Sequence, residues 1–143
     1  MSFYNIAILG DGLNSEAIAL RRWLLKAFRD LGIARRHVRF LNASDIRTAS
    51  RSLPLVATLF CTASSAEDVA AALDAQARGA PVIPAVSDLG SFKAVCPEAL
   101  QGHNGIAVGG DLAGLPRLGA AILEWLGLLR RQRRLFLSYR RDQ

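Results

Sequence analysis

The chain has 143 residues, of which 51% are hydrophobic and 21% are charged, with a formal net charge of +6. This length and composition are those of a single globular domain with a real core. No apolar run reaches about 18 residues, and the N-terminus lacks the pattern of a signal peptide, so we expect a cytoplasmic domain without membrane contact. The two cysteines, Cys61 and Cys96, lie in apolar surroundings outside any CxxC pair and are expected to be buried free thiols.

The positive charge is concentrated near the C-terminus. Residues 130–141 contain six of the 18 basic residues and no acidic residue, and the rest of the chain is close to neutral. A basic cluster can bind phosphates, but no aromatic side chains interleave with the arginines at 130–134 as a base-stacking platform would require. The stretch is therefore expected to be a charged linker, and nucleic acid is not expected as a partner.

Strand and helix patterns alternate along the chain. Short apolar runs predict strands at residues 5–9, 37–41, 53–61, 81–86 and 106–108. Helical spacing predicts helices at residues 16–31, 66–78 and 115–129, the second capped by Ser64 or Ser65. Residues 43–50 are a short helix or a loop, and residues 87–104 are irregular with one helical turn.

Two helices are expected to pack through faces defined by helical spacing. The first face consists of Ile18, Leu20, Leu24, Leu25, Phe28 and Leu31, and the last helix presents Leu118, Ile122, Trp125 and Leu129. Trp23 and Trp125 are candidate interface anchors, although a position in the core is the expectation for each.

The five strands are continuously apolar, which is typical of strands buried on both faces. Such strands require a parallel sheet covered by helices on each side. The predicted fold is therefore α/β, a three-layer sandwich of the flavodoxin type with a five-stranded parallel sheet.

Ligands of such folds bind beyond the carboxyl ends of the strands. The loops expected there carry Gly10, Asp11, Gly12, Ser64 and Asp88, which are weak candidates for ligand binding. The glycines could bring backbone N–H groups to a phosphate, but the dinucleotide fingerprint is incomplete and a tight turn is the favoured interpretation. No metal-binding set and no nucleophile–base pair is recognisable, so no catalytic residue is predicted.

Three segments resemble the Toll/interleukin-1 receptor (TIR) family. Residues 135–142, Leu-Phe-Leu-Ser-Tyr-Arg-Arg-Asp, resemble the first strand of a TIR domain. Residues 79–85, Gly-Ala-Pro-Val-Ile-Pro-Ala, are similar to a segment in the middle of that fold, and residues 96–100 resemble the segment that follows it. The resemblance implies a degenerate TIR-like domain at residues 1–130, then a basic linker and the possible first strand of a second TIR domain at residues 131–143.

The resemblance also implies that the active site is lost. In TIR domains that cleave NAD, a glutamate lies about eight residues before the glycine that Gly79 resembles, and here that position holds Ala71. Glu67 could replace it only if the alignment slips. The implied function is a non-catalytic module that controls assembly of a downstream TIR effector through self-association or another TIR domain. NAD would then be a substrate of the parent protein, in the part after Gln143.

Two alternatives stay open. One is a sensor domain for a nucleotide-type ligand bound at the Gly10–Gly12 turn, and the other is NAD cleavage by this domain.

Overall fold

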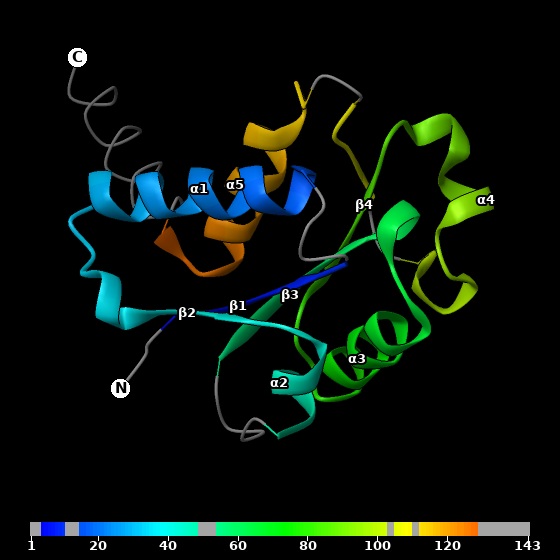
Figure 1. Cartoon of the computed structure of the whole chain (residues 1–143), viewed down its shortest axis with the longest axis horizontal. Helices are drawn as coiled ribbons and strands as arrows, with labels where there is room; N and C mark the ends of the chain where they lie inside the picture. The colour runs from blue at the N-terminus through cyan, green and yellow to red at the C-terminus, as the bar shows by residue number, and fades with distance from the viewer. Residues whose placement is uncertain (1–3, 11–14, 49–53, 103–104, 110–111, 129–143) are drawn as a thin grey trace, which may run out of the picture.

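The computed structural model describes residues 4–10, 15–48, 54–102, 105–109 and 112–128. Strands and helices alternate along these residues (Figure 1). The elements are β1 (Tyr4–Leu9), α1 (Ser15–Asp30), β2 (Val38–Leu41), α2 (Ala43–Thr48), β3 (Leu55–Phe60), α3 (Ala66–Ala77), β4 (Val82–Val86), α4 (Phe92–Val95), β5 (Ile106–Ala107) and α5 (Leu115–Trp125). Short 3₁₀ turns precede β2, follow β3 and flank α4.

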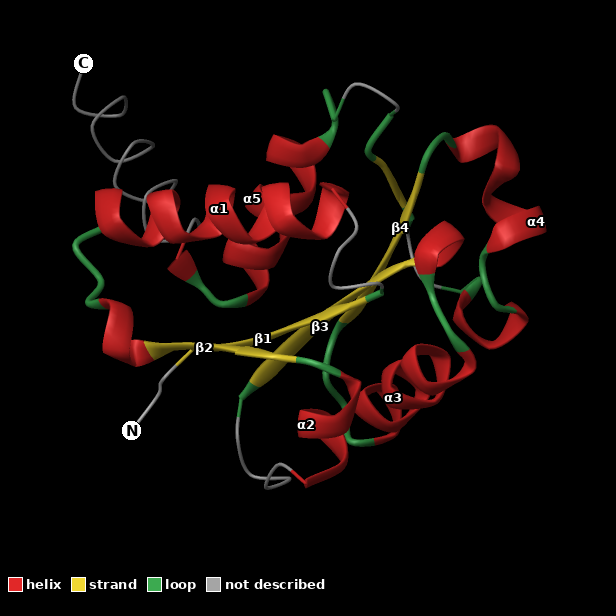
Figure 2. Cartoon of the chain, in the orientation of Figure 1, coloured by secondary structure: helices red, strands yellow, loops and turns green. Residues whose placement is uncertain are grey.

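The five strands form one sheet in the order β2-β1-β3-β4-β5, and every pair is parallel. Helices α1 and α5 cover one face of this sheet, and α2 and α3 cover the other (Figure 2). The flavodoxin-like α/β sandwich expected from the continuous apolar strands is therefore confirmed. Among the described helices, none is long and apolar enough to cross a membrane.

Successive strand residues supply two separate cores, because side chains alternate across a sheet. In β1, Ile6 packs with the α1 and α5 residues, whereas Ala7 packs with α2 and α3. Two polar side chains are fully buried between these layers. Asn5 donates from Nδ2 to the carbonyl of Pro54 at 3.0 Å, and Thr58 donates from Oγ1 to the carbonyl of Ile83 at 2.8 Å. These bonds satisfy groups whose burial would otherwise be costly.

The α1 and α5 layer is packed through large side chains. Leu20, Leu24 and Phe28 are buried as expected, but Ile18 is 39% exposed. The buried face of α1 is thus rotated from the predicted one, and Trp23 lies half-buried against α5. A Cβ atom on Gly119 would lie 2.3 Å from the Trp23 ring, so the glycine makes room for the indole.

The α2 and α3 layer is packed closely through the alanines of α3. Ser65, not Ser64, caps this helix: its Oγ accepts from the N–H of Asp68 at 3.2 Å, and the Asp68 carboxylate accepts from the N–H of Ser65 at 2.9 Å. Arg78 ties the layer together by donating to Asp74 at 2.9 Å and to the carbonyl of Ile46 at 3.0 Å. Residues 43–50 were predicted as a short helix or a loop, and residues 43–48 form α2.

A further expectation about the core, besides that for Ile18, is wrong. Trp125 was expected to lie on the buried face of the last helix, but its side chain is 59% exposed. It is the last residue of α5, and the helix ends there rather than at residue 129. The predictions for residues 131–143, a basic linker and the possible first strand of a second domain, lie outside the described residues.

Candidate functional site

The strand order places a topological switch point between β1 and β3, where neighbouring connections leave the sheet in opposite directions. Gly10, Ser64 and Asp88 follow the adjacent strands β1, β3 and β4, so the sheet carries all three to its carboxyl edge. Asp11 and Gly12 lie outside the described residues. The loops expected to gather at this edge therefore do so, as far as the described residues extend.

The described residues at this edge stabilise the backbone of the loops and do not form a reaction centre. Gly10 has a φ of 146°, a value that L side chains rarely adopt, so the turn after β1 requires a glycine. Ser64 donates from Oγ to the carbonyl of Cys61 at 3.1 Å and is half-buried. Asp88 is exposed. None of these three residues lines the cavities at the amino end of the strands or those between α1 and β2.

Ala71, the position that the resemblance would align with the TIR glutamate, lies inside the core. Ala71 is 0% exposed and packs between α3 and the sheet with Ala72 and Ala75. Glu67 is exposed in the first turn of α3, where a carboxylate interacts favourably with the helix dipole. A carboxylate at position 71 would point into an apolar interior rather than into a cleft.

The two cysteines are buried in the same core cluster, as expected. Burial, and then the neighbouring Cys96 thiol, raise the pKa of the Cys61 thiol to about 12. Burial also raises the pKa of Cys96. Since the thiolate is the reactive form, these thiols are poor nucleophiles at neutral pH. Within the described chain, no group of three or more His, Cys, Asp or Glu residues could hold a metal ion.

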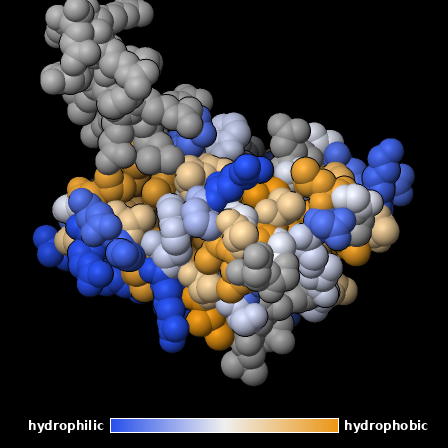
Figure 3. Space-filling model, turned by 90° about the horizontal axis from the view of Figure 1, so that it is seen from above, coloured by the Kyte–Doolittle hydropathy of each residue, from blue (hydrophilic) through white to orange (hydrophobic). Residues whose placement is uncertain are grey.

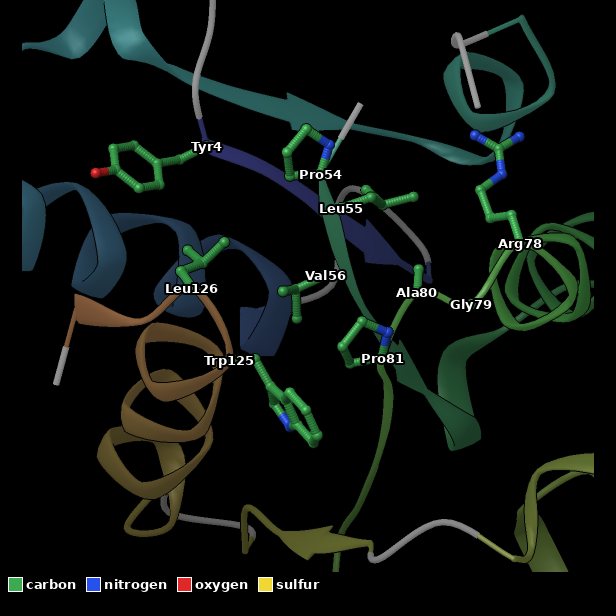
Figure 4. A pocket seen from close by; sticks show the side chains of 10 residues that line it. All are labelled: Tyr4, Pro54, Leu55, Val56, Arg78, Gly79, Ala80, Pro81, Trp125 and Leu126. Carbon is green, nitrogen blue, oxygen red and sulfur yellow. The ribbon is translucent and has the colours of Figure 1, made fainter. Parts of the chain in front are cut away.

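A cavity of about 470 Å³ opens at the opposite, amino end of the strands (Figure 4). Val56 from β3, Pro81 beside β4 and the exposed Trp125 line it, and Tyr4 stands at its other side. The guanidinium of Arg78 points away from this cavity towards α2, consistent with its bond to Ile46. Among its lining residues only Tyr4 and Arg78 carry ionisable groups, so the cavity offers mainly apolar and aromatic contact surface.

A third region is strongly basic. The outer face of α1, the turn at Arg35–His37 and the edge strand β2 carry seven basic side chains: Arg21, Arg22, Lys26, Arg29, Arg35, Arg36 and Arg39. Figure 3, which looks onto the α1 and α5 layer, shows hydrophilic residues gathered at the end where these elements lie. Among the described residues, none of the seven forms an ion pair with an acidic side chain.

Sequence reasoning missed this basic region because its residues come from three elements and are separated by apolar ones. Outside residues 130–141 the basic and acidic residues are equal in number. The net charge of this part therefore does not reveal that its basic residues gather in one region of the structure. A signal was present: residues 21–39 contain seven basic residues and only one acidic residue, Asp30.

No model of a known protein family matches the chain, and no curated protein sequence is significantly similar to it.

Proposed function

We propose that this chain is a non-catalytic TIR-like module that mediates the assembly or regulation of a downstream TIR effector domain, through self-association or contact with another TIR domain. NAD cleavage, where the parent protein performs it, would belong to the part after Gln143. The TIR relationship itself rests on the segments at residues 79–85, 96–100 and 135–142.

The environment of Ala71 is the observation that carries this proposal. A catalytic acid must reach the substrate, whereas Ala71 is fully buried between α3 and the sheet. Glu67, which could substitute if the alignment slips, is exposed one turn earlier, in the first turn of α3. The geometry supports a scaffold that has kept the fold without the acid that the family uses for chemistry.

The amino-end cavity supports a role in association. Large exposed aromatic side chains commonly anchor protein interfaces, and Trp125 lies beside a cavity lined by apolar residues. Tyr4, Val56 and Pro81 would supply complementary surface around the indole.

Sedimentation velocity and an NAD hydrolysis assay on the same preparations test the proposal. We expect the chain to self-associate, Trp125→Ala to weaken the association by about tenfold or more, and neither protein to cleave NAD. Arg117→Ala, which changes another exposed α5 residue outside the cavity, is the matched control and should associate normally. NAD turnover that disappears in Glu67→Ala would contradict the non-catalytic assignment.

A sensor for a nucleotide-type ligand is the second candidate, favoured by the position of the Gly10 turn at the switch point. Titration calorimetry with ATP and with NAD tests it, using Asp11→Ala as the variant. Binding that Asp11→Ala alters would favour the sensor, whereas unchanged self-association in that variant is expected from an assembly module.

A further inference from the structure

Two adjoining cavities run between α1 and the edge strand β2. One has a volume of about 490 Å³ and the other of about 570 Å³. Arg22 and Leu25 line both, so the two cavities meet at the middle of α1. Together they form one elongated depression, which we call the α1–β2 groove. One end of the groove reaches the carboxyl ends of β1 and β2, where Ile8, Leu41 and Asn42 line it. The groove shares no lining residue with the amino-end cavity.

The floor of the α1–β2 groove is apolar. Ile8 and Phe40 come from the sheet, Leu25 from α1, and Ile33 from the segment between α1 and β2. Ile8, Ile33 and Phe40 pack against the core. All four side chains stay partly exposed, because β2 is an edge strand of the described sheet. Ile18, at the rim, is 39% exposed. The groove therefore leaves apolar area in contact with water, and covering it would be favourable.

The rim of the groove is cationic. Arg21, Arg22 and Lys26 come from α1, and Arg35 approaches from the turn before β2. The guanidinium carbons of Arg21 and Arg35 lie 5.0 and 5.6 Å from the centroid of the Phe40 ring. Two like charges are thus held near one aromatic ring, and among the described residues neither forms an ion pair. An anion at this position would relieve their repulsion.

One acidic side chain lies at the end of the groove. Asp45 lines the smaller cavity, and its carboxylate accepts a hydrogen bond from the N–H of Asn42 at 3.0 Å. The Asn42 side chain accepts from the N–H of Asp45 in return at 2.9 Å. This reciprocal cap at the start of α2 engages the carboxylate locally, so the cationic rim keeps its net positive charge.

We propose that the α1–β2 groove binds an acidic amphipathic peptide segment of a partner protein. An apolar floor between cationic rims complements a segment with one apolar and one acidic side. Arginine is also the residue best suited to paired hydrogen bonds with carboxylates. A nucleic-acid backbone would use the rim without the floor. The inference deepens the proposed function by giving the interaction module a class of partner.

The size of the groove sets the length of that segment. The lining residues on α1 extend from Ala17 to Arg29. At 1.5 Å per residue this part of α1 measures about 18 Å, which corresponds to roughly three turns of a bound helix. A segment with apolar residues at helical spacing over three turns would therefore fill the groove.

Fluorescence anisotropy with the full chain tests the proposal. The probe is a labelled peptide of about 16 residues with leucine on one helical face and glutamate elsewhere. We expect saturable binding that weakens with added salt, and a loss of about tenfold or more in affinity for Arg22→Glu and separately for Ile18→Asp. Arg117→Glu makes the same charge change on α5, outside the groove, and should bind within about twofold of the wild type. Circular dichroism melts confirm that each variant folds.

Four outcomes would overturn the proposal. The first is equal binding of a polyglutamate peptide without leucines, since this would show attraction by charge alone. The second is tighter binding of duplex DNA or of phosphatidylserine vesicles with the same sensitivity to Arg22→Glu. The third is the absence of peptide binding, and the fourth is loss of self-association in Arg22→Glu, which would assign the groove to a second copy of the chain. These outcomes differ from those that would contradict the proposed function. That function would be contradicted by NAD turnover, or by normal self-association of Trp125→Ala.

Discussion

The two faces of the sheet are covered by layers with different surfaces. The α2 and α3 layer is closed: small alanines bring α3 close to the strands, Ser65 and Asp68 cap it, and Arg78 ties it to α2. The α1 and α5 layer is packed through larger side chains, and leaves Trp125 and the cationic groove exposed. The α2 and α3 layer thus uses its polar groups to stabilise the fold. The α1 and α5 layer has polar and apolar groups that remain available to a partner.

The separation of charge follows the same division. Residues 15–48 carry eight basic and three acidic side chains, whereas residues 54–128 carry three basic and seven acidic ones. Arg78, in the α2 and α3 layer, has a side chain that is only 7% exposed and is paired with Asp74. The basic side chains of the α1–β2 groove lack such partners among the described residues. Unpaired surface charge of this kind is available for association.

Placing a glutamate at position 71 should destabilise the α2 and α3 layer severely. Ala71→Glu places a carboxylate where the alanine is 0% exposed and apolar side chains surround it. We expect a loss of about 4 kcal/mol or more in the free energy of unfolding, because an unpaired buried charge and a larger side chain must both be accommodated. Urea denaturation measures this change. Glu67→Ala should cost no more than about 1 kcal/mol, and a well-folded Ala71→Glu protein would contradict our description of this site.

The two tryptophans of the α1 and α5 layer differ in burial and should therefore differ in their effect on stability. Trp23 packs over Gly119, so Trp23→Ala should lower the free energy of unfolding by about 3 kcal/mol. Trp125 is 59% exposed, so Trp125→Ala should change stability by less than about 0.5 kcal/mol. Thermal unfolding of both variants checks this difference. Equal and large losses would show that Trp125 is a core residue after all.

The cap of α3 predicts a smaller effect. Ser65→Ala removes the acceptor for the Asp68 N–H, and we expect a loss of about 1 kcal/mol in the free energy of unfolding. Ser64→Ala is the matched control, because its hydroxyl donates to the carbonyl of Cys61 and does not cap the helix. Denaturant unfolding of the pair should rank Ser65→Ala as the less stable. The reverse ranking would assign the cap to Ser64.

The buried thiols predict an effect only at alkaline pH. The pKa of Cys61 is raised from 9.0 to about 12, so the folded state holds the thiol proton more tightly than the unfolded chain does. This contribution to stability is fully present below pH 9.0 and is lost as the pH rises towards 12. Stability measured between pH 8 and about pH 10 should therefore fall more steeply for the wild type than for Cys61→Ala. Parallel curves for the two proteins would contradict the raised pKa.

Local patterns in the sequence were sufficient for the sheet and for most helices. Continuous apolar runs such as the one around Val56 occur where a strand is buried on both faces, and this property alone indicates a parallel sheet between helices. The ends of two helices could also be predicted, because glycine often ends a helix. Gly32 and Gly79 adopt positive φ values at these ends. The fold class and the burial of the two cysteines could therefore be predicted from the sequence pattern.

Only the tertiary structure decided which side chains of a helix reach the core and which charges meet. Helical spacing treats Ile18 and Trp125 as members of buried faces, but in the structure both are exposed. The approach of Arg21 and Arg35 to one ring depends on how α1 lies against β2, since 14 positions separate the two arginines in the chain. Periodicity records which residues share a face of one element. The groove arises between elements, and for that reason it could be found only in three dimensions.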